Sequence, residues 1–364
     1  MQARFFPSRT VSLYMARLFV VRTFAILAAL VIVLQALDLL SESGRILAVP
    51  GNGNAEIWRY IGYRTPQIIG VFLPFSVLLS TILTLSMLNQ NSEVIALKAS
   101  GLSAHQVLAP LILTGFIIAI VAFAFNDRVV SRATAALNRW DKVQFAAVPI
   151  DRGDRLNVWV RDGDDLINVT SAKGKGNAVV LTGVTLYDRQ AGNLIGVVRA
   201  EKGVRVSNGW RIQRAIRFDV ASGKSRQLGD IVIARSVRPD QFTLTNVDPN
   251  GLSFGALSSA INDLHDAGRP TKALEGSLWH KISGPLSSVL MPLLGAVAAF
   301  GIARSGKLFI RAVIAMALGF AYFVADNFAI AMGDLGAYPP LLAAWAPFVL
   351  FLLIGELVLV RSEE

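Results

Sequence analysis

The chain contains no cysteine among its 364 residues and only three histidines. Without cysteine, disulfides and thiolate metal sites are excluded, and the redox compartment cannot be inferred. No pair of histidines has metal-ligand spacing, and P-loop, nucleophile-elbow, GxGxxG and HExxH motifs are all absent. We therefore expect no metal, no cofactor and no catalytic role, and any ATP-driven work would have to be performed by a partner.

Charged residues are also scarce. They make up 16% of the chain against 53% for hydrophobic residues, and the mean hydropathy is +0.52. A soluble domain carries about 25% charged residues, so the composition indicates a polytopic membrane protein with a soluble part attached. The net charge of +10 is better explained by membrane orientation and an anionic ligand than by nucleic acid.

Six apolar segments match the ~20 residues that a membrane-spanning helix needs. They cover residues 17–40, 63–88, 105–126, 279–303, 309–331 and 338–360. The first is too long for the apolar core of a signal peptide, and no small-residue cleavage site follows it, so we expect it to be the first spanning helix. The loop after it is expected over 41–62.

The short loops set the expected orientation. Basic residues collect on one side of the membrane, namely Arg4, Arg9, Arg17, Arg304, Lys307, Arg311 and Arg361. The positive-inside bias makes this side cytoplasmic. We therefore expect a multi-pass membrane protein with both termini in the cytoplasm and residues 127–275 on the opposite side of the membrane.

Residues 127–275 change character, because their apolar runs shorten to strand length and alternate with polar residues. Seven such runs cover 157–161, 166–170, 179–187, 194–199, 204–206, 210–218 and 231–234. This spacing predicts an antiparallel sandwich or roll, closed by an amphipathic helix over about 253–267. Patterning alone leaves open whether its interior is a packed core or holds acyl chains.

The expected fold class is therefore an α-helical polytopic membrane protein with six transmembrane helices and an inserted all-β domain. The expected domains are residues 1–126 with three spans, 127–275 with the β domain, and 276–364 with three more spans. Few aromatic residues lie in the β domain, so a stacking platform for nucleic acid is not expected.

The segment Asn91–Ser103 is a polar interruption between the second and third spans. Its pattern predicts an amphipathic helix ended by Gly101, with Val94, Ile95 and Leu97 opposite Glu93 and Lys98. One interpretation is an interfacial linker. The other is a coupling helix that transmits a push from a cytoplasmic motor, with its apolar side against the motor or the bilayer.

Charged residues near the spans are the remaining candidates for function, since charges in membrane segments are costly. Asp38 lies near the end of the first span and Asp326 within the fifth, where it is either a structural hydrogen-bonding group or part of a transport path. Basic residues Arg128, Arg132, Arg139 and Lys142 follow the third span. They form either a solvated face or a collar for phosphate groups, which arginine binds well.

Several motifs together are specific. They are Ser92-Glu93 with Ala99-Ser100-Gly101, Trp159–Gly163, Gly183–Tyr187, Asp248-Pro249, Trp279–Ile282 with Pro285–Ser287, Phe300-Gly301, Gly319-Phe320 and Pro339-Pro340. On these residues the chain resembles, nearly end to end, the LptF/LptG (YjgP/YjgQ) permeases, the membrane subunits of the lipopolysaccharide export ABC transporter. The Ala-Ser-Gly form and the Asp38 region look more like the LptG branch.

The resemblance implies a location in the bacterial inner membrane with residues 127–275 in the periplasm, and it implies a fold, partners and a route for the lipid. A sister LptF-like permease would face this chain around a cavity, and a cytoplasmic ATPase dimer would dock on the coupling helices. Lipopolysaccharide would enter from the outer leaflet of the inner membrane, between the first and fifth spans of opposite partners. The β domain would be a periplasmic jellyroll, continued by a periplasmic bridge protein with a single membrane anchor.

The resemblance also assigns roles to residues. The ATPase-coupling residues would be Glu93, Val94, Leu97, Lys98 and Gly101. The substrate-binding residues would be Gln35, Asp38, Arg45, Arg128, Arg132, Arg139 and Arg311. LptG relatives can carry lysines around the end of the first span, whereas this chain has Gln35, Ser41 and Glu42, with Arg45 the nearest base. Alternative hypotheses are a membrane-anchored periplasmic scaffold, the LptF-type sister permease and a permease for another lipid.

Overall fold

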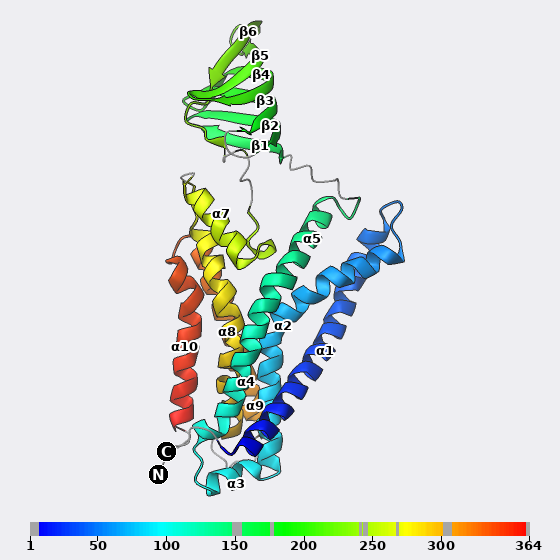
Figure 1. Cartoon of the computed structure of the whole chain (residues 1–364), viewed down its shortest axis with the longest axis vertical. Coiled ribbons are helices and arrows are strands. Elements are labelled where there is room, and N and C mark those ends of the chain that lie inside the picture. Colours follow the sequence, from blue (N-terminus) through cyan, green and yellow to red (C-terminus); the bar gives the residue numbers. More distant parts are fainter. Residues whose placement is uncertain are drawn as a thin grey trace. The chain divides into compact units, whose positions relative to one another are not determined.

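The computed structural model describes residues 7–147, 155–174, 178–239, 242, 247–266, 269–300 and 308–361. The chain divides into two compact units, one helical and one built on a β-sheet (Figure 1). The helical unit comprises Met1–Val148, Asp248–Ser258 and Thr271–Glu364, and the β unit comprises Pro149–Val247 and Ser259–Pro270.

Long helices make up the helical unit. They are α1 (Arg9–Leu47), α2 (Asn54–Gln90), the short α3 (Glu93–Ala99), α4 (Ala104–Phe125), α5 (Ser131–Lys142), α8 (Lys272–Phe300), α9 (Leu308–Asp334) and α10 (Pro340–Arg361). A π-helical turn, Asn126–Val130, joins α4 to α5 without a break. Helix α7 (Phe254–Asp266) is amphipathic as expected, and it buries Leu257, Ile261 and Leu264.

Within the described residues, five helical segments are long and apolar enough to cross a membrane. They are Arg9–Leu47, Asn54–Gln90, Ala104–Lys142, Ala312–Asp334 and Pro340–Arg361. The expected fourth span, 279–303, coincides with α8 as far as Phe300, and its last residues lie outside the described ranges. Membrane-spanning helices are thus present, and a total of six stays a prediction.

Helix α8 is the centre of the helical unit, because it packs against α2, α4, α9 and α10. Leu290 and Leu294 of α8 are fully buried in this core. On α4, a Cβ added at Gly115 would lie 2.7 Å from the backbone oxygen of Ser288 in α8. Small residues at such crossings allow helices in a membrane to approach closely.

The first two helices extend well beyond their apolar segments, so the expected loop over 41–62 is wrong. Only Ala48–Gly53 lies between α1 and α2. The 39 residues of α1 correspond to roughly 58 Å, about twice the thickness of the hydrocarbon layer. Hydropathy marks where the membrane ends, whereas the helices continue because Ile46, Tyr60 and Trp140 form a small core beyond it.

The β unit contains one six-stranded antiparallel sheet in the order β1-β2-β3-β4-β5-β6. The strands are β1 (Arg155–Asp162), β2 (Asp165–Lys173), β3 (Val180–Gln190), β4 (Asn193–Val206), β5 (Gly209–Asp219) and β6 (Ser225–Ile233). Consecutive strands are neighbours throughout (Figure 1). An antiparallel β domain is thus present, while a jellyroll stays a prediction.

Two of the expected strands, 194–199 and 204–206, are one strand in the structure. Both ends of β4 pair with β5, Val197 with Phe218 and Val204 with Arg211. The apolar alternation fails between them because Glu201 and Lys202 are both exposed, although the backbone ladder continues. Strand β6 begins at Ser225, earlier than expected. Its first three residues are exposed and polar at the edge of the sheet, so the apolar pattern did not reveal them.

One apolar core lies against the sheet. Val169, Val184 and Ile212 are buried in it, together with the large rings of Trp210 and Phe242. The Trp210 indole Nε1–H donates to the Val237 carbonyl at 2.9 Å, which satisfies its polar atom. Side chains therefore pack this interior. Of the two readings that the sequence left open, the described residues favour the packed core.

Candidate functional site

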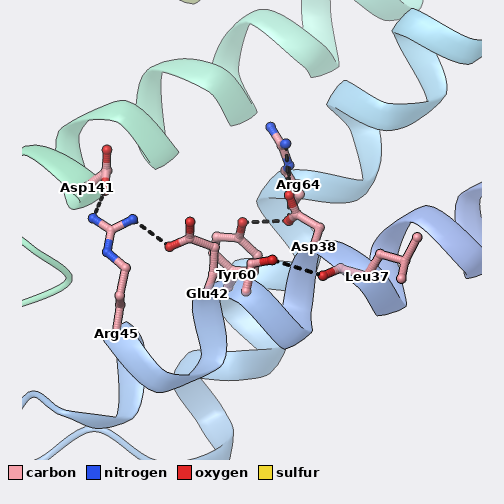
Figure 2. Close-up of polar contacts among 8 residues, drawn as sticks. Leu37, Asp38, Glu42, Arg45, Tyr60, Arg64 and Asp141 are labelled. Atoms are coloured by element: carbon pink, nitrogen blue, oxygen red, sulfur yellow. Dashed lines mark hydrogen bonds and ion pairs between the residues drawn. The ribbon is translucent and has the colours of Figure 1, made fainter.

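A polar cluster forms where the C-terminal part of α1 meets the N-terminal part of α2 (Figure 2). The Asp38 carboxylate accepts hydrogen bonds from the Tyr60 hydroxyl at 2.6 Å and from Arg64 Nε and Nη2 at 3.1 and 2.9 Å. Tyr60 and Arg64 are one helical turn apart, so both reach the same carboxylate. Asp38 is therefore held within the chain.

Gln35 lies one turn before Asp38 on α1 and is buried. Its Oε1 accepts from the Thr65 hydroxyl at 3.1 Å, and its Nε2 has no hydrogen-bond partner among the described residues. Arg64 Nη1 donates to Gln67 at 2.8 Å, and Gln67 Nε2 donates to Thr134 of α5 at 3.2 Å. These contacts connect α1, α2 and α5.

Arg45 is also held by acidic partners. Its guanidinium contacts Glu42 at 2.6 Å and Asp141 of α5 at 3.0 Å, as Figure 2 shows, and it lies 5.1 Å from the centre of the Phe145 ring. The Arg45 and Asp141 side chains are more than half exposed and that of Glu42 is partly exposed, so solvent screens both pairs and each contributes little to stability. In this cluster, Asp38, Glu42 and Asp141 oppose two guanidiniums, so it offers an anion no unopposed positive charge.

The arginines on the extension of α4 differ. Arg128 lies in the π-helical turn, and Arg132 and Arg139 lie on α5; all three side chains are exposed. Arg132 and Arg139 are separated by two turns, about 10 Å along the helix axis, and share a face. Arg139 Nε donates to the Ala135 carbonyl at 3.1 Å. The described part of the chain provides no carboxylate partner for these three arginines.

Arg311 lies on α9, and its side chain lies outside the described residues. The structure therefore brings Gln35, Asp38 and Arg45 into one region and Arg132 and Arg139 onto one helix.

The expected helix of the segment Asn91–Ser103 is present as α3. Gly101 follows it with φ +89°, and its N–H donates to the Lys98 carbonyl at 3.0 Å. The Glu93 carboxylate accepts weak hydrogen bonds from the Tyr14 hydroxyl at 3.5 Å and the Asn91 amide at 3.3 Å. Lys98 is exposed.

The apolar side of α3 differs from the expectation that it contacts a partner or the bilayer. Val94 is only 4% exposed and belongs to the core of the helical unit, against which Leu97 also packs. Ile95 is 60% exposed. Val94 and Leu97 therefore attach α3 to its own chain, and Ile95 stays exposed.

Two long helices leave most of their apolar surface uncovered. In their most apolar stretches, 22% of the residues of α1 and of α9 are buried, compared with 56% in α2 and in the segment formed by α4 and α5. Leu37 and Leu40 of α1, and Phe320 and Phe328 of α9, are among the large exposed side chains. These faces contact lipid or another membrane protein when the chain is in a bilayer.

Sequence reasoning missed Tyr60 and Arg64, and it missed the partner of Asp326. The signal for Arg64 was present, since a base at the start of the second span faces an acid at the end of the first. Asp326 on α9 is buried and lies 2.9 Å from His280 of α8, so a structural hydrogen bond between neighbouring helices is observed.

The fold and these sites define a class. Apolar helices that can span a membrane, packed around α8, and an antiparallel β domain are the properties of a multi-pass membrane protein. The chain matches the family model "Lipopolysaccharide export system permease LptF/LptG" over residues 13–361. It therefore belongs to the LptF/LptG family of lipopolysaccharide export permeases.

Similar proteins agree with this assignment. The chain is 24% identical to LptG, the lipopolysaccharide export system permease protein of Escherichia coli K12, over 305 residues, which cover 82% of this chain and 83% of that protein. It is also 24% identical to LptG of Haemophilus influenzae over 346 residues, covering 86% and 89% of the two chains.

Proposed function

We propose that this chain is the LptG-type permease subunit of an ABC transporter that extracts lipopolysaccharide from the outer leaflet of the inner membrane. It passes the lipid to a periplasmic β bridge toward the outer membrane. Family membership supports the transport class, and the similar proteins named LptG support this branch over the LptF-type sister. The observation that carries the proposal is a set of exposed arginines that have no carboxylate partner among the described residues, Arg128, Arg132 and Arg139.

These arginines suit the chemistry of the lipid. Lipopolysaccharide carries phosphate groups, and a guanidinium binds a phosphate through two parallel hydrogen bonds. Arg45 and Arg64 already contact carboxylates, so a phosphate would have to displace Glu42, Asp141 or Asp38. We therefore assign phosphate contact first to α5 and its preceding turn, and assign Asp38 to holding α1 against α2.

The acyl chains need an apolar surface, and burial of that surface contributes about 25 cal/mol per Å². The uncovered faces of α1 and α9 provide such a surface. In the proposed assembly, these two faces meet the lipid and a sister LptF-like permease. The grip on the lipid must then alternate between tight and weak, because a fixed site of this size could not release it.

ATP hydrolysis by a partner drives this alternation in the proposal. The basic flanks favour a cytoplasmic position for both termini and α3, and therefore a periplasmic position for the β unit. A cytoplasmic ATPase dimer then contacts Glu93, Ile95 and Lys98, while Val94 and Leu97 transmit its movement to the helical core. A periplasmic bridge protein with a single membrane anchor receives the lipid from the β unit.

Photocrosslinking tests the lipid site. A photoreactive residue placed at Arg132 or Arg139 should form a lipopolysaccharide adduct in the working transporter, and one placed at Ser100 should not. Ser100 is a matched control, because it is exposed but lies after α3, at the opposite end of α4 from Arg132. Absence of adducts at both arginines during active transport would disprove the phosphate assignment.

A charge reversal tests the coupling role. Glu93→Lys should reduce both lipid release and lipid-stimulated ATPase activity, whereas Ser100→Lys adds the same charge nearby and keeps the Glu93 carboxylate. Equal activity of the two variants would rule out a role for Glu93 in coupling. Co-purification separates this function from the scaffold hypothesis, which predicts no stable cytoplasmic ATPase partner.

A further inference from the structure

A pocket of ≈ 460 Å³ lies between α1 and α2, at the opposite end of these helices from Asp38. Its lining includes Arg22, Ala25 and Ile26 of α1, and Leu83, Met87 and Gln90 of α2. No acidic residue lines it. The pocket thus combines apolar walls with one cation.

Arg22 has weak partners for a charged group in a membrane-spanning helix. Its Nη2 donates to the Met87 sulfur, and thioether sulfur is a weak acceptor. Its Nη1 is buried and has no hydrogen-bond partner in the described part of the chain. Charged groups in a membrane are costly unless they are paired, and among the described residues Arg22 has no anionic partner.

The position of the pocket indicates the source of that anion. The 16 positions from Arg22 to Asp38 correspond to roughly 24 Å along α1, most of the ~30 Å hydrocarbon thickness. Gln90 ends α2 immediately before the polar segment Asn91–Ser103. The pocket therefore lies near the headgroup level of the leaflet opposite the Asp38 cluster.

We propose that this pocket binds a glycerophospholipid, with Arg22 contacting the phosphate and Ile26 and Leu83 contacting an acyl chain. Gln90 also lines the pocket, and its side-chain amide can donate to the same headgroup. The site goes beyond the proposed function, because the transported lipid is assigned to the other leaflet. A lipid here would fix the end of α2 from which α3 starts.

Lipid retention by the purified full-length chain tests the proposal. Wild-type protein, Arg22→Gln and Ala25→Phe are incubated with phosphatidylglycerol, delipidated equally and measured by native mass spectrometry. Arg17→Gln is the matched control, because Arg17 is exposed on the same helix and does not line the pocket. Arg22→Gln should retain about tenfold less phospholipid, the effect of losing a hydrogen bond to a charged group. Ala25→Phe should also retain less, because the added ring would occupy the pocket.

The two variants act differently, which keeps the test decisive. Arg22→Gln removes the cation, whereas Ala25→Phe fills the pocket and leaves the cation in place. Unchanged thermal unfolding would show that both variants fold. Retention like wild type in both would overturn the proposal. Loss of a co-purified membrane-anchored protein without loss of phospholipid would also overturn it, since the occupant would then be a partner helix. Lipopolysaccharide crosslinking at Arg132 is measured separately, so failure of the transport proposal can be distinguished from failure of this phospholipid site.

Discussion

The pairing of Asp38 with Arg64 predicts a measurable coupling energy. Arg64→Gln removes the guanidinium that contacts both carboxylate oxygens of Asp38 and leaves Tyr60 as the remaining donor. Asp38→Asn removes the charge and leaves the guanidinium without its carboxylate. We expect each variant to lower the free energy of unfolding, because the pair joins α1 to α2.

The magnitude follows from geometry and exposure. A hydrogen bond to a charged group contributes about 1.5–3 kcal/mol, and truncation of one partner of a fully buried pair costs about 3–5 kcal/mol. The Arg64 side chain is 37% exposed and that of Asp38 20%, so solvent screening reduces these values. We expect a loss of about 2 kcal/mol for each single variant and a coupling energy of about 1–2 kcal/mol.

Unfolding by sodium dodecyl sulfate in mixed micelles, followed by circular dichroism, measures the double-mutant cycle. The cycle of Arg45→Gln with Asp141→Asn is the control, because both side chains are more than half exposed. Its coupling energy should be below about 1 kcal/mol. Additivity of Asp38→Asn and Arg64→Gln within about 0.5 kcal/mol would refute the reasoning and would make Asp38 available as a ligand.

Three further predictions concern packing and protonation. Gly115→Leu should prevent the close approach of α4 to α8 and lower the yield of folded protein in detergent, whereas Gly255→Leu, in open space, should not. Val94→Ala should lower the free energy of unfolding by roughly 2 kcal/mol, while Ile95→Ala should leave it nearly unchanged but weaken ATPase binding, as a pull-down would show. The Ser222 side chain and backbone lower the pKa of Asp219 below its ordinary value of 3.8. The stabilisation that ionised Asp219 contributes is therefore present above its ordinary pKa and lost as the pH falls through the lowered pKa. An NMR titration of Asp219 should give a midpoint below 3.8.

The membrane-spanning segments could be predicted from the sequence because their apolar runs are long and nearly uninterrupted. The ends of the helices could not be predicted, since α1 continues past its apolar run to Ile46, which packs with Tyr60 of α2 and Trp140 of α5. Similarly, β4 appeared as two strands because hydropathy follows side chains, whereas the ladder follows the backbone. Interactions between distant segments determine both features, and a local pattern does not contain them.

The same limit applies to the charged residues of the site. In the sequence, Arg45 and Arg132 are equivalent candidates, because each follows the end of an apolar span. The structure separates them by their partners: Arg45 contacts two carboxylates, and Arg132 is exposed without one among the described residues. A phosphate arriving at Arg45 must first displace those carboxylates, whereas at Arg132 it displaces only water. Assignment of a ligand-binding arginine therefore depends less on its position along a span than on whether the fold has already neutralised it.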